Sequence, residues 1–496
     1  MMRWLVAGFA VVAILVSVWR LEADKTDLVI VPLEVTGGTP ATLYLRPDAP
    51  PAPAVVIAHG FAGSRQLMEP FALALAQAGY VVASFDFEGH GRNPRPMSGD
   101  VTTVQGTTQL LMAEAGRVAD AIRAHPQADG RLAFLGHSMA SDIVVRQAME
   151  EPPADAVVAV SMFSRAVTED APRNLLVIVG DWEARLKEEA LRALHLADPV
   201  AAPRETVGDP AAGTGRRVVF APSVEHVGVL YSGTALREAR AWLDASFGRE
   251  SAGDVPLRGG WIALLLVGVV ALGWPLSQLL PKGTRLPPRL PRGRFLAAAL
   301  LPALAVPLIL WPVETRILPV LVADYLAVHM ALYGALTLLL LSRWQGLGDE
   351  FPPSVFLIGL AVAFFGIALF GGALDRYVAS FFPHGGRAWV IVGLMLGAVP
   401  FMLGDALLTE GGRAPFWRVL LVRAAFLASL AAAVALDFQR LFFLVIILPV
   451  IVLFFLLFGM MAGWVGRRTG LPAAAGLGLG FVLAWALGVT FPMFAV

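Results

Sequence analysis

The stretch Leu132-Ala133-Phe134-Leu135-Gly136-His137-Ser138-Met139-Ala140 decides the fold. Its four leading apolar residues predict a buried strand, and the residues from Ser138 onward have the apolar spacing of a helix. Gly136 and Ala140 are small, so a helix and a strand can approach each other closely around Ser138. This pattern is G-x-S-x-G with Ala at its last position. It predicts a sharp turn that raises a nucleophilic serine hydroxyl, where the alternative is an ordinary helix N-cap.

Segments with strand-like and helix-like patterns alternate on both sides of this stretch. Two strands followed by alternating strands and helices predict an α/β fold with an open, mostly parallel sheet and helices on both faces. The predicted strands are 28–35, 41–45, 54–58, 81–85, 132–135, 156–160, 175–179 and 218–221. The predicted helices are 68–78, 109–124, 138–149, 183–196 and 236–247.

Histidines late in the chain are candidates for a general base. His226 follows the last predicted strand directly, so its imidazole is expected to reach Ser138 and accept the hydroxyl proton. His195 is the competing candidate, but it lies within a helical pattern and is more typical of a packed or exposed side chain. We therefore predict His226 as the base.

Two acids follow the strand 175–179 in the segment Gly180-Asp181-Trp182-Glu183. A carboxylate near the base is needed to hold the histidine in one tautomer. Asp181 and Glu183 are both candidates from their position alone.

A Gly-rich segment, His59-Gly60-Phe61-Ala62-Gly63, follows the strand 54–58. Backbone N–H groups in such a segment can stabilise the negative charge that develops on a carbonyl oxygen during acyl transfer. A Gly-rich turn without a function is the alternative.

These motifs together resemble the α/β-hydrolase superfamily, in particular its compact monoglyceride-lipase-like and dienelactone-hydrolase-like members, over about residues 28–248. The resemblance implies a serine hydrolase of the carboxylesterase or lipase kind, without a metal or an organic cofactor. It implies Glu183 as the acid, because superfamily members place this residue three positions after the glycine, with Asp181 in reserve. Ser161 to Asn174 are too few for the helical lid of many lipases, so the domain is expected to be lidless.

The resemblance also assigns the loops around the predicted nucleophile. The backbone amides of Phe61 and Met139 are the expected oxyanion donors. His90, in a D-x-x-G-H-G loop, is expected to brace its neighbours rather than act as the base. The remaining supporting-loop residues are His59, Gly60, Gly136 and His137.

The second half of the chain has the composition of a membrane protein. The 496 residues are 57% hydrophobic and only 15% charged, whereas soluble domains average roughly 25% charged residues. Residues 1–20 are predicted to form an uncleaved N-terminal anchor, with a cleaved secretory signal peptide as the alternative. Residues 21–255 are predicted to form the hydrolase domain, and 256–496 a membrane domain of about eight helices of ~20 apolar residues each. The predicted spans of this domain are 261–280, 295–313, 317–341, 354–374, 388–408, 418–436, 441–465 and 471–494.

A basic loop between the first two of these spans predicts the orientation. It contains Lys282, Arg285, Arg289, Arg292 and Arg294 and no acid. By the positive-inside rule this loop and the N-terminus are cytoplasmic, so the hydrolase domain is extracytoplasmic. The plasma membrane is the expected location.

Composition also limits the function. A formal net charge of zero argues against nucleic acid as a partner. The absence of cysteine rules out disulfides, thiolate metal sites and a cysteine nucleophile. We expect a hydrolase acting on an ester, thioester or amide bond of a lipid or other amphiphilic acyl substrate. The alternatives are a transporter or channel whose hydrolase-fold domain senses or gates, and an acyltransferase. The sequence predicts no oligomeric state.

Overall fold

The chain forms two compact units in the computed structural model, which describes residues 1–284, 289–315, 317–320, 322–347 and 351–495. The helical unit contains Met1–Leu15, Leu265–Leu374 and Phe381–Phe491. The sheet unit contains Val16–Leu264 together with two later segments, Asp375–Ser380 and Pro492–Val496. Arg285 of the predicted basic loop lies outside the described residues.

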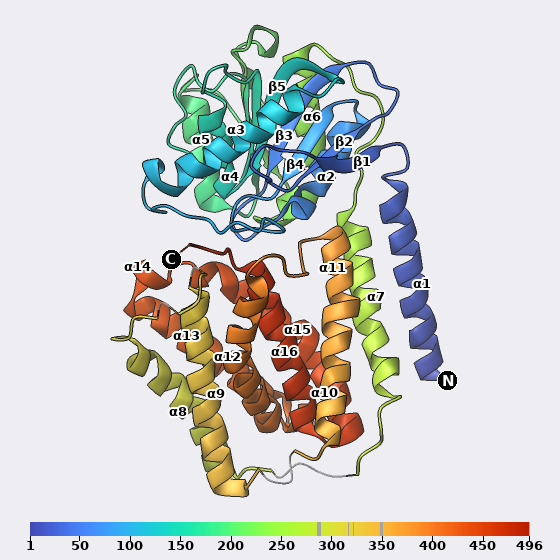
Figure 1. The fold of residues 1–496 in the computed structure, drawn as a ribbon, viewed down its shortest axis with the longest axis vertical. Helices are drawn as coiled ribbons and strands as arrows, with labels where there is room; N and C mark the ends of the chain where they lie inside the picture. Colours follow the sequence, from blue (N-terminus) through green and yellow to red (C-terminus); the bar gives the residue numbers. More distant parts are fainter. Residues whose placement is uncertain (285–288, 316, 321, 348–350, 496) are drawn as a thin grey trace. The chain divides into compact units, whose positions relative to one another are not determined.

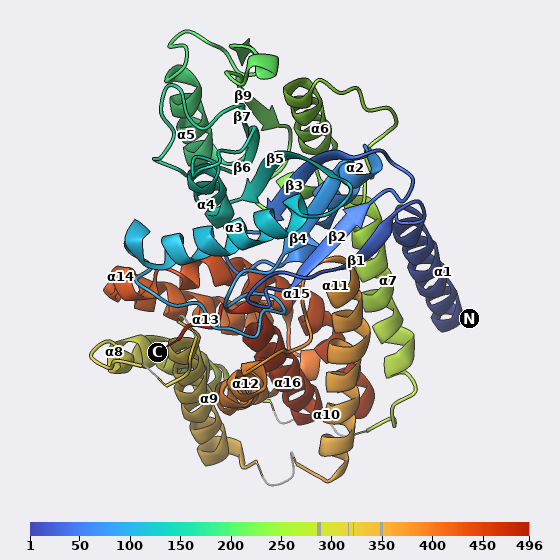
Figure 2. The same cartoon turned by 45° about the horizontal axis from the view of Figure 1, so that its top comes forward.

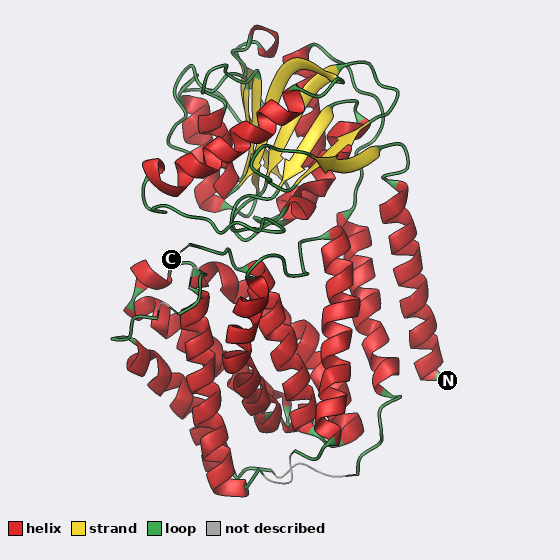
Figure 3. Ribbon diagram, viewed as in Figure 1, coloured by secondary structure: helices red, strands yellow, loops and turns green. Residues whose placement is uncertain are grey.

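The sheet unit is built on one sheet, whose strands are yellow in Figure 3. In the described residues the sheet has nine strands in the order β1-β2-β4-β3-β5-β6-β7-β9-β8. The strands from β4 to β9 are parallel to one another, whereas β1, β2 and β8 pair in antiparallel fashion with their neighbours. The bounds are β1 Val29–Leu33, β2 Ala41–Leu45, β3 Ala52–Ala58, β4 Val81–Phe85, β5 Ala128–His137, β6 Ala156–Val160, β7 Leu175–Gly180, β8 Thr206–Val207 and β9 Arg216–Ala221.

The central strands are apolar because helices cover both faces of the sheet. Every residue of β3, β4, β6 and β7 is buried, which is why these strands show continuous rather than alternating apolar runs. Helices α2 and α6 pack on one face, and α3, α4 and α5 lie on the other (Figures 1 and 2). Their bounds are α2 Glu69–Gln77, α3 Gln109–Arg123, α4 Met139–Gln147, α5 Ala184–His195 and α6 Gly233–Phe247.

The predicted α/β fold with a mostly parallel sheet is confirmed. Each predicted strand and helix of this part exists, with ends that differ by a few residues. The two-residue strand β8 was not predicted, because Thr206 and Val207 are too few to produce a periodic pattern. Residues 161–174, between β6 and β7, form no helix, as expected for a lidless domain.

The sheet unit closes with two contacts between segments far apart in the sequence. The Arg258 guanidinium is buried and binds Glu69 at 2.8 Å, Asp24 at 3.1 Å and the carbonyl of Leu21 at 2.9 Å, so it joins the start and the end of the main segment. The tail residues Met493 and Ala495 form backbone hydrogen bonds with Gly89 and Met97.

The helical unit contains most of the apolar helices. Among the described residues, nine helices are long and apolar enough to cross a membrane, one near the N-terminus and eight after residue 258, as predicted. The chain is therefore a multi-pass membrane protein. These helices are Met2–Ala23 (α1), Gly259–Ser277 (α7), Arg292–Leu310 (α8), Ala323–Gln345 (α9), Ser354–Tyr377 (α10 to α11), Arg387–Leu408 (α12), Phe416–Leu436 (α13), Ile447–Thr469 (within α15, Leu444–Thr469) and Pro472–Thr490 (α16).

Candidate active site

Ser138 lies on a sharp turn between β5 and α4. Its φ is 55° and its ψ is −119°, a conformation that costs free energy for a residue with a side chain. The turn is held by a 2.9 Å hydrogen bond from the Ser138 N–H to the carbonyl of Val160. A Cβ on Gly136 would come within 2.6 Å of the Ala140 carbonyl oxygen. The strand and the helix approach each other so closely here that the motif requires small residues. The turn also lifts the Ser138 hydroxyl away from the strand.

His226 is the side chain that meets this hydroxyl. It lies in the loop after β9, and its Nε2 is 2.8 Å from Ser138 Oγ. The loop is fixed by the Glu225 carboxylate, which accepts hydrogen bonds from the N–H groups of Val227 and Gly228. His137 Nε2 adds a 2.8 Å hydrogen bond to the His226 carbonyl oxygen. The imidazole is 43% exposed, so a substrate can reach it.

Glu183 holds the other side of the imidazole. Its Oε1 is 2.5 Å from His226 Nδ1, and its Oε2 accepts hydrogen bonds from Ser161 Oγ at 2.8 Å and the Gly180 N–H at 2.7 Å. Burial by itself would raise the pKa of Glu183, but the hydrogen bonds from His226, Ser161 and Gly180 outweigh it, so the pKa is lowered. An ionised carboxylate at Nδ1 keeps the proton there and leaves Nε2 free to accept the proton of Ser138.

The reserve candidates lie elsewhere. Asp181 is half-exposed and its carboxylate binds Lys187 at 2.9 Å. His195 Nε2 binds the carbonyl of Ala201 at 3.2 Å. Ser138 and Glu183 thus each contact His226, whereas Asp181 and His195 are held by other partners.

The Gly-rich loop after β3 passes directly beside the serine. A Cβ on Gly60 would lie 3.0 Å from Ser138 Cβ. Next to the serine, the Met139 N–H belongs to the first turn of α4, where N–H groups lack acceptors within the helix. Phe61 and Met139 therefore lie in the two segments that border Ser138, as their predicted role as oxyanion donors requires. That role stays a prediction.

His59 and His90 are both buried. His59 Nδ1 binds the Gly60 carbonyl at 2.8 Å, and its Nε2 accepts a hydrogen bond from the Phe87 N–H at 3.2 Å. Burial lowers the pKa of His59, so the ring is neutral and fixes the loop. The His90 ring lies 5.2 Å from that of His59, and its Nδ1 binds the Glu88 carbonyl.

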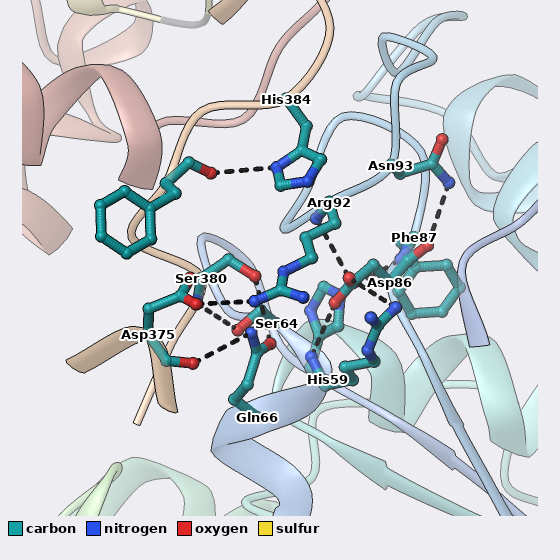
Figure 4. A network of polar contacts seen from close by, with 12 residues as sticks. His59, Ser64, Gln66, Asp86, Phe87, Arg92, Asn93, Asp375, Ser380 and His384 are labelled. Carbon is teal, nitrogen blue, oxygen red and sulfur yellow. Dashed lines mark hydrogen bonds and ion pairs between the residues drawn. The ribbon is translucent and has the colours of Figure 1, made fainter. Parts of the chain in front are cut away.

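Asp86 ties the Gly-rich loop to the loop after β4. Its buried carboxylate accepts hydrogen bonds from the N–H groups of Arg65 at 2.8 Å and Arg92 at 3.0 Å, and it pairs with the Arg65 guanidinium at 3.2 Å. Figure 4 shows Asp86 next to Arg92, with Asn93 on the same loop. One carboxylate therefore links the residues that follow the Gly-rich loop to the loop after β4.

The segment Asp375–Ser380 extends this network within the sheet unit (Figure 4). Asp375 Oδ2 binds the Arg92 guanidinium at 2.7 Å. The Ser380 N–H donates to Ser64 Oγ at 3.1 Å, and its hydroxyl donates to Gln66 Oε1 at 3.1 Å. Because Ser64 and Gln66 directly follow the Gly-rich loop, residues from far along the chain help to hold that loop.

Asp375→Asn is expected to lower kcat for ester cleavage about 3- to 10-fold with little change in KM. The ion pair itself is partly exposed and contributes little to stability. Its loss frees Arg92, whose loop is linked through Asp86 to the segment after the Gly-rich loop, so the predicted oxyanion donor Phe61 is expected to be displaced slightly and the rate to fall. Steady-state kinetics on the purified full chain measure this effect. Asp129→Asn is the matched control, because it breaks an equally close pair with Arg131 at the start of β5; an equal loss in both variants contradicts the prediction.

His137 is expected to make the sheet unit sensitive to acid. Burial, together with the nearby His226, lowers its pKa to about 3, against roughly 6.5 in an unfolded chain. The unfolded chain therefore binds more protons below pH ~6.5, and folding stability falls as the pH drops from there towards about 3, by about 2 kcal/mol at pH 5. His137→Gln removes the histidine that the unfolded chain protonates. The thermal unfolding midpoint of this variant is therefore expected to change less between pH 7.5 and pH 5 than that of the wild type. Equal changes in the two proteins contradict this.

Sequence reasoning did not identify Ser161, Asp86 or Asp375. Ser161 is the first residue after β6. A polar residue directly after a buried strand is a signal by which the sequence could have identified it. Asp86 stands at the corresponding place after β4, so the same signal applied. No local pattern marks Asp375, because its partner Arg92 is more than 280 positions away.

Comparison with known proteins finds a hydrolase family that matches part of the sheet unit. The family described as serine aminopeptidase, S33, matches residues 49–203. Two uncharacterized proteins from two strains of Mycobacterium tuberculosis are 33% identical over 104 residues, which are 21% of this chain and 34% of each relative. The chain thus spans about a third of the length of the curated relatives it matches.

Two solved hydrolase structures are also similar to this chain. A dienelactone hydrolase from Anabaena variabilis has 19% identity and a TM-score of 0.31, covering 44% of this chain and 96% of its own. A predicted CIB-like hydrolase from Thermoplasma acidophilum has 14% identity and a TM-score of 0.35, covering 44% and 97%. The family match over residues 49–203 and the mostly parallel sheet show an α/β-hydrolase fold in this part of the chain, which is fused to a multi-pass helical part.

Proposed function

We propose that this protein is a serine hydrolase that cleaves an ester, thioester or amide bond of a lipid or other amphiphilic acyl substrate through an acyl-enzyme. The observation that carries the proposal is the chain of contacts from Ser138 Oγ to His226 Nε2, 2.8 Å, and from His226 Nδ1 to Glu183, 2.5 Å. A nucleophile, a base and an acid that orients the base are what acyl transfer requires.

In the first half-reaction Ser138 Oγ attacks the carbonyl carbon and its proton moves to His226 Nε2. The carbonyl π bond becomes a lone pair on oxygen, and the N–H groups of Phe61 and Met139 stabilise this charge. The carbon–leaving-group bond then breaks, and the leaving group takes the proton from His226. Glu183 stabilises the imidazolium that exists between these steps.

In the second half-reaction water replaces the leaving group. His226 accepts a proton from the water, whose oxygen attacks the acyl carbon. The bond to Ser138 Oγ breaks, and Oγ recovers its proton from His226. An alcohol in place of water would make the protein an acyltransferase with the same residues.

The proposed substrate class is supported by apolar side chains that border the site. Phe163, Trp182 and Val227 are 60%, 68% and 45% exposed. Each lies within two residues of Ser161, Glu183 or His226. Exposed large apolar side chains grouped on neighbouring loops mark surfaces that bind apolar partners. An acyl chain is such a partner, and the membrane spans of the same chain keep the domain close to lipids.

A serine-reactive fluorophosphonate probe tests the chemistry. Labelling of the purified full chain, and its absence in Ser138→Ala, is the expected result. The matched control is Ser161→Ala, which keeps the nucleophile and is expected to retain label. Equal labelling of wild type and Ser138→Ala contradicts the proposal, and full physiological activity of an unlabelled Ser138→Ala would favour a transporter or channel with a sensing domain.

Graded acyl esters test the substrate class. Phe163→Ser is expected to raise KM for a long-chain ester several-fold, because it removes an apolar contact, while KM for an acetyl ester stays within twofold. Equal effects on both esters argue against an acyl-binding role for this side chain. Product analysis with an added alcohol separates hydrolysis from acyl transfer.

We also propose a plasma-membrane location with the N-terminus in the cytoplasm and the hydrolase domain outside. The chain has no cysteine, so single cysteines report accessibility without background. Glu150→Cys in the sheet unit is expected to react with an impermeant maleimide in intact cells. Thr284→Cys, in the basic loop, is expected to react only after permeabilisation. The reverse pattern contradicts this orientation.

A further inference from the structure

A basic pocket lies in the helical unit between the ends of α7 and α15. Its volume is about 400 Å³. Its lining combines cations with indole rings and contains no acidic side chain among the described residues: Trp274, Lys282, Arg413, Trp464, Arg467 and Arg468. Four positive charges around one cavity create a strong attraction for an anion.

Arg467 and Arg468 are held in place by backbone carbonyl groups. Arg468 Nε donates to the carbonyl of Leu280 at 2.9 Å, and Arg467 Nη1 donates to the carbonyl of Gly412 at 2.8 Å. Carbonyl oxygens fix the position of a guanidinium but do not cancel its charge. In the part of the chain that the structure describes, Lys282, Arg467 and Arg468 form no ion pair. The pocket therefore presents fixed, uncompensated cations.

An apolar pocket of about 310 Å³ lies between the same two helices. Leu276 and Leu280 line it from the α7 side, and Met461 and Val465 line it from α15. Phe365, between α10 and α11, closes it further. Its lining is almost entirely hydrocarbon and aromatic, so it suits an alkyl chain.

The two pockets share a wall at Gly273. A Cβ on Gly273 would lie 3.4 Å from the Trp464 ring, which lines the basic pocket, and 3.5 Å and 3.7 Å from Phe365 and Met461, which line the apolar pocket. The basic pocket and the apolar pocket are therefore adjacent, as the head and the tail of an amphiphilic ligand would require.

We propose that this paired pocket is a binding site for an anionic phospholipid. The phosphate group binds among Lys282, Arg467 and Arg468, and one acyl chain lies against Leu276, Phe365 and Met461. The indoles of Trp274 and Trp464 stand between the polar and apolar parts, as aromatic side chains do at membrane interfaces. Basic pockets between membrane helices are known to bind anionic head groups. The site belongs to the helical unit alone and does not depend on the proposed chemistry of Ser138.

The two pockets together favour a lipid over a free phosphate ion. Inorganic phosphate shares the chemistry of the head group, but it would use only the basic pocket and leave the apolar pocket without a role. Isolated arginines at helix ends also occur as topology signals. Arginines that act only as topology signals need no pocket around them and no adjoining apolar pocket.

Native mass spectrometry of the delipidated full chain tests the proposal. The protein is titrated with phosphatidylglycerol, phosphatidylcholine and inorganic phosphate, and the apparent Kd of the first adduct is measured. Phosphatidylglycerol is expected to bind at least tenfold more tightly than phosphatidylcholine. Inorganic phosphate is expected not to displace it at the same concentration.

Two charge-matched double variants locate the site. Each cation near a membrane surface strengthens binding of anionic lipid about fivefold, so Lys282→Gln with Arg468→Gln is expected to weaken phosphatidylglycerol binding about 30-fold. The control removes two equal charges outside the pocket, Arg292→Gln with Arg294→Gln, and is expected to change binding less than twofold. If the first double variant does not fold, Lys282→Gln alone serves, because Lys282 is exposed.

A third variant tests the apolar half. Ala361 is exposed and lines the apolar pocket. Ala361→Phe fills this space, so it is expected to weaken binding of long-chain phosphatidylglycerol at least about fivefold and to leave the dihexanoyl form unchanged. The proposal is overturned if phosphatidylcholine binds equally well, if both double variants weaken binding equally, or if inorganic phosphate displaces the lipid at equal concentration. Equal effects of Ala361→Phe on both chain lengths overturn the assignment of the acyl chain.

Discussion

His226→Ala is expected to lower kcat for ester cleavage about 10⁴- to 10⁶-fold, because the Ser138 hydroxyl then loses the imidazole that lies 2.8 Å away and accepts its proton. KM is expected to change little, since the imidazole is not needed to hold the acyl chain. Rates of ester cleavage by the purified full chain, with the unfolding midpoint as a check on folding, measure this.

His195→Ala is the matched control for this prediction. His195 binds the carbonyl of Ala201 and not Ser138, so its removal is expected to leave kcat within twofold. If folded His226→Ala retains more than a tenth of the wild-type rate, another group accepts the Ser138 proton.

Replacement of the two acids after β7 is expected to give opposite results. Glu183→Gln is expected to lower kcat about 10³- to 10⁴-fold, because an amide can donate to Nδ1 and so favours the tautomer that cannot accept the Ser138 proton at Nε2. Asp181→Asn is expected to stay within threefold, because the Asp181 carboxylate pairs with the partly exposed Lys187 and not with His226. The pair is measured on the same ester at a single neutral pH.

Because the pKa of Glu183 is lowered, the comparison of Glu183→Gln with Asp181→Asn does not change in mildly acidic solution. The carboxylate remains ionised as the pH falls below neutrality, so the loss in Glu183→Gln is expected to be present at pH 6 as well as at pH 8. A loss in Asp181→Asn as large as that in Glu183→Gln would move the role of the acid to Asp181.

Local sequence patterns predicted the architecture because each signal acts over a few residues. The buried runs of β3 to β7 needed only apolar residues in succession, and the turn at Ser138 needed only small neighbours at Gly136 and Ala140. The membrane helices were recognisable by length and apolarity alone. Local position left Asp181 and Glu183 equally possible, and only the resemblance to the α/β-hydrolase superfamily favoured Glu183, the acid that contacts His226 in the structure.

Contacts over long sequence distances were beyond such patterns. The pairing of Arg92 with Asp375 depends on how two segments of the sheet unit come together. The hydroxyl of Ser161 contacts Glu183 only because β6 and β7 are neighbours in the sheet. No local pattern indicates that Arg92 pairs with Asp375 or that Ser161 contacts Glu183, so only the folded chain reveals these contacts.

The tail bonds to Gly89 and Met97 have a consequence for how the protein is made and handled. The Met493 N–H donates to the Gly89 carbonyl, the Met97 N–H to the Met493 carbonyl, and the Ala495 N–H to the Met97 carbonyl. These tail residues follow the described membrane helices in the sequence, so during synthesis the loop at residues 89–97 gains these partners only after those helices have been made. A fragment that ends at residue 264 therefore lacks these three hydrogen bonds.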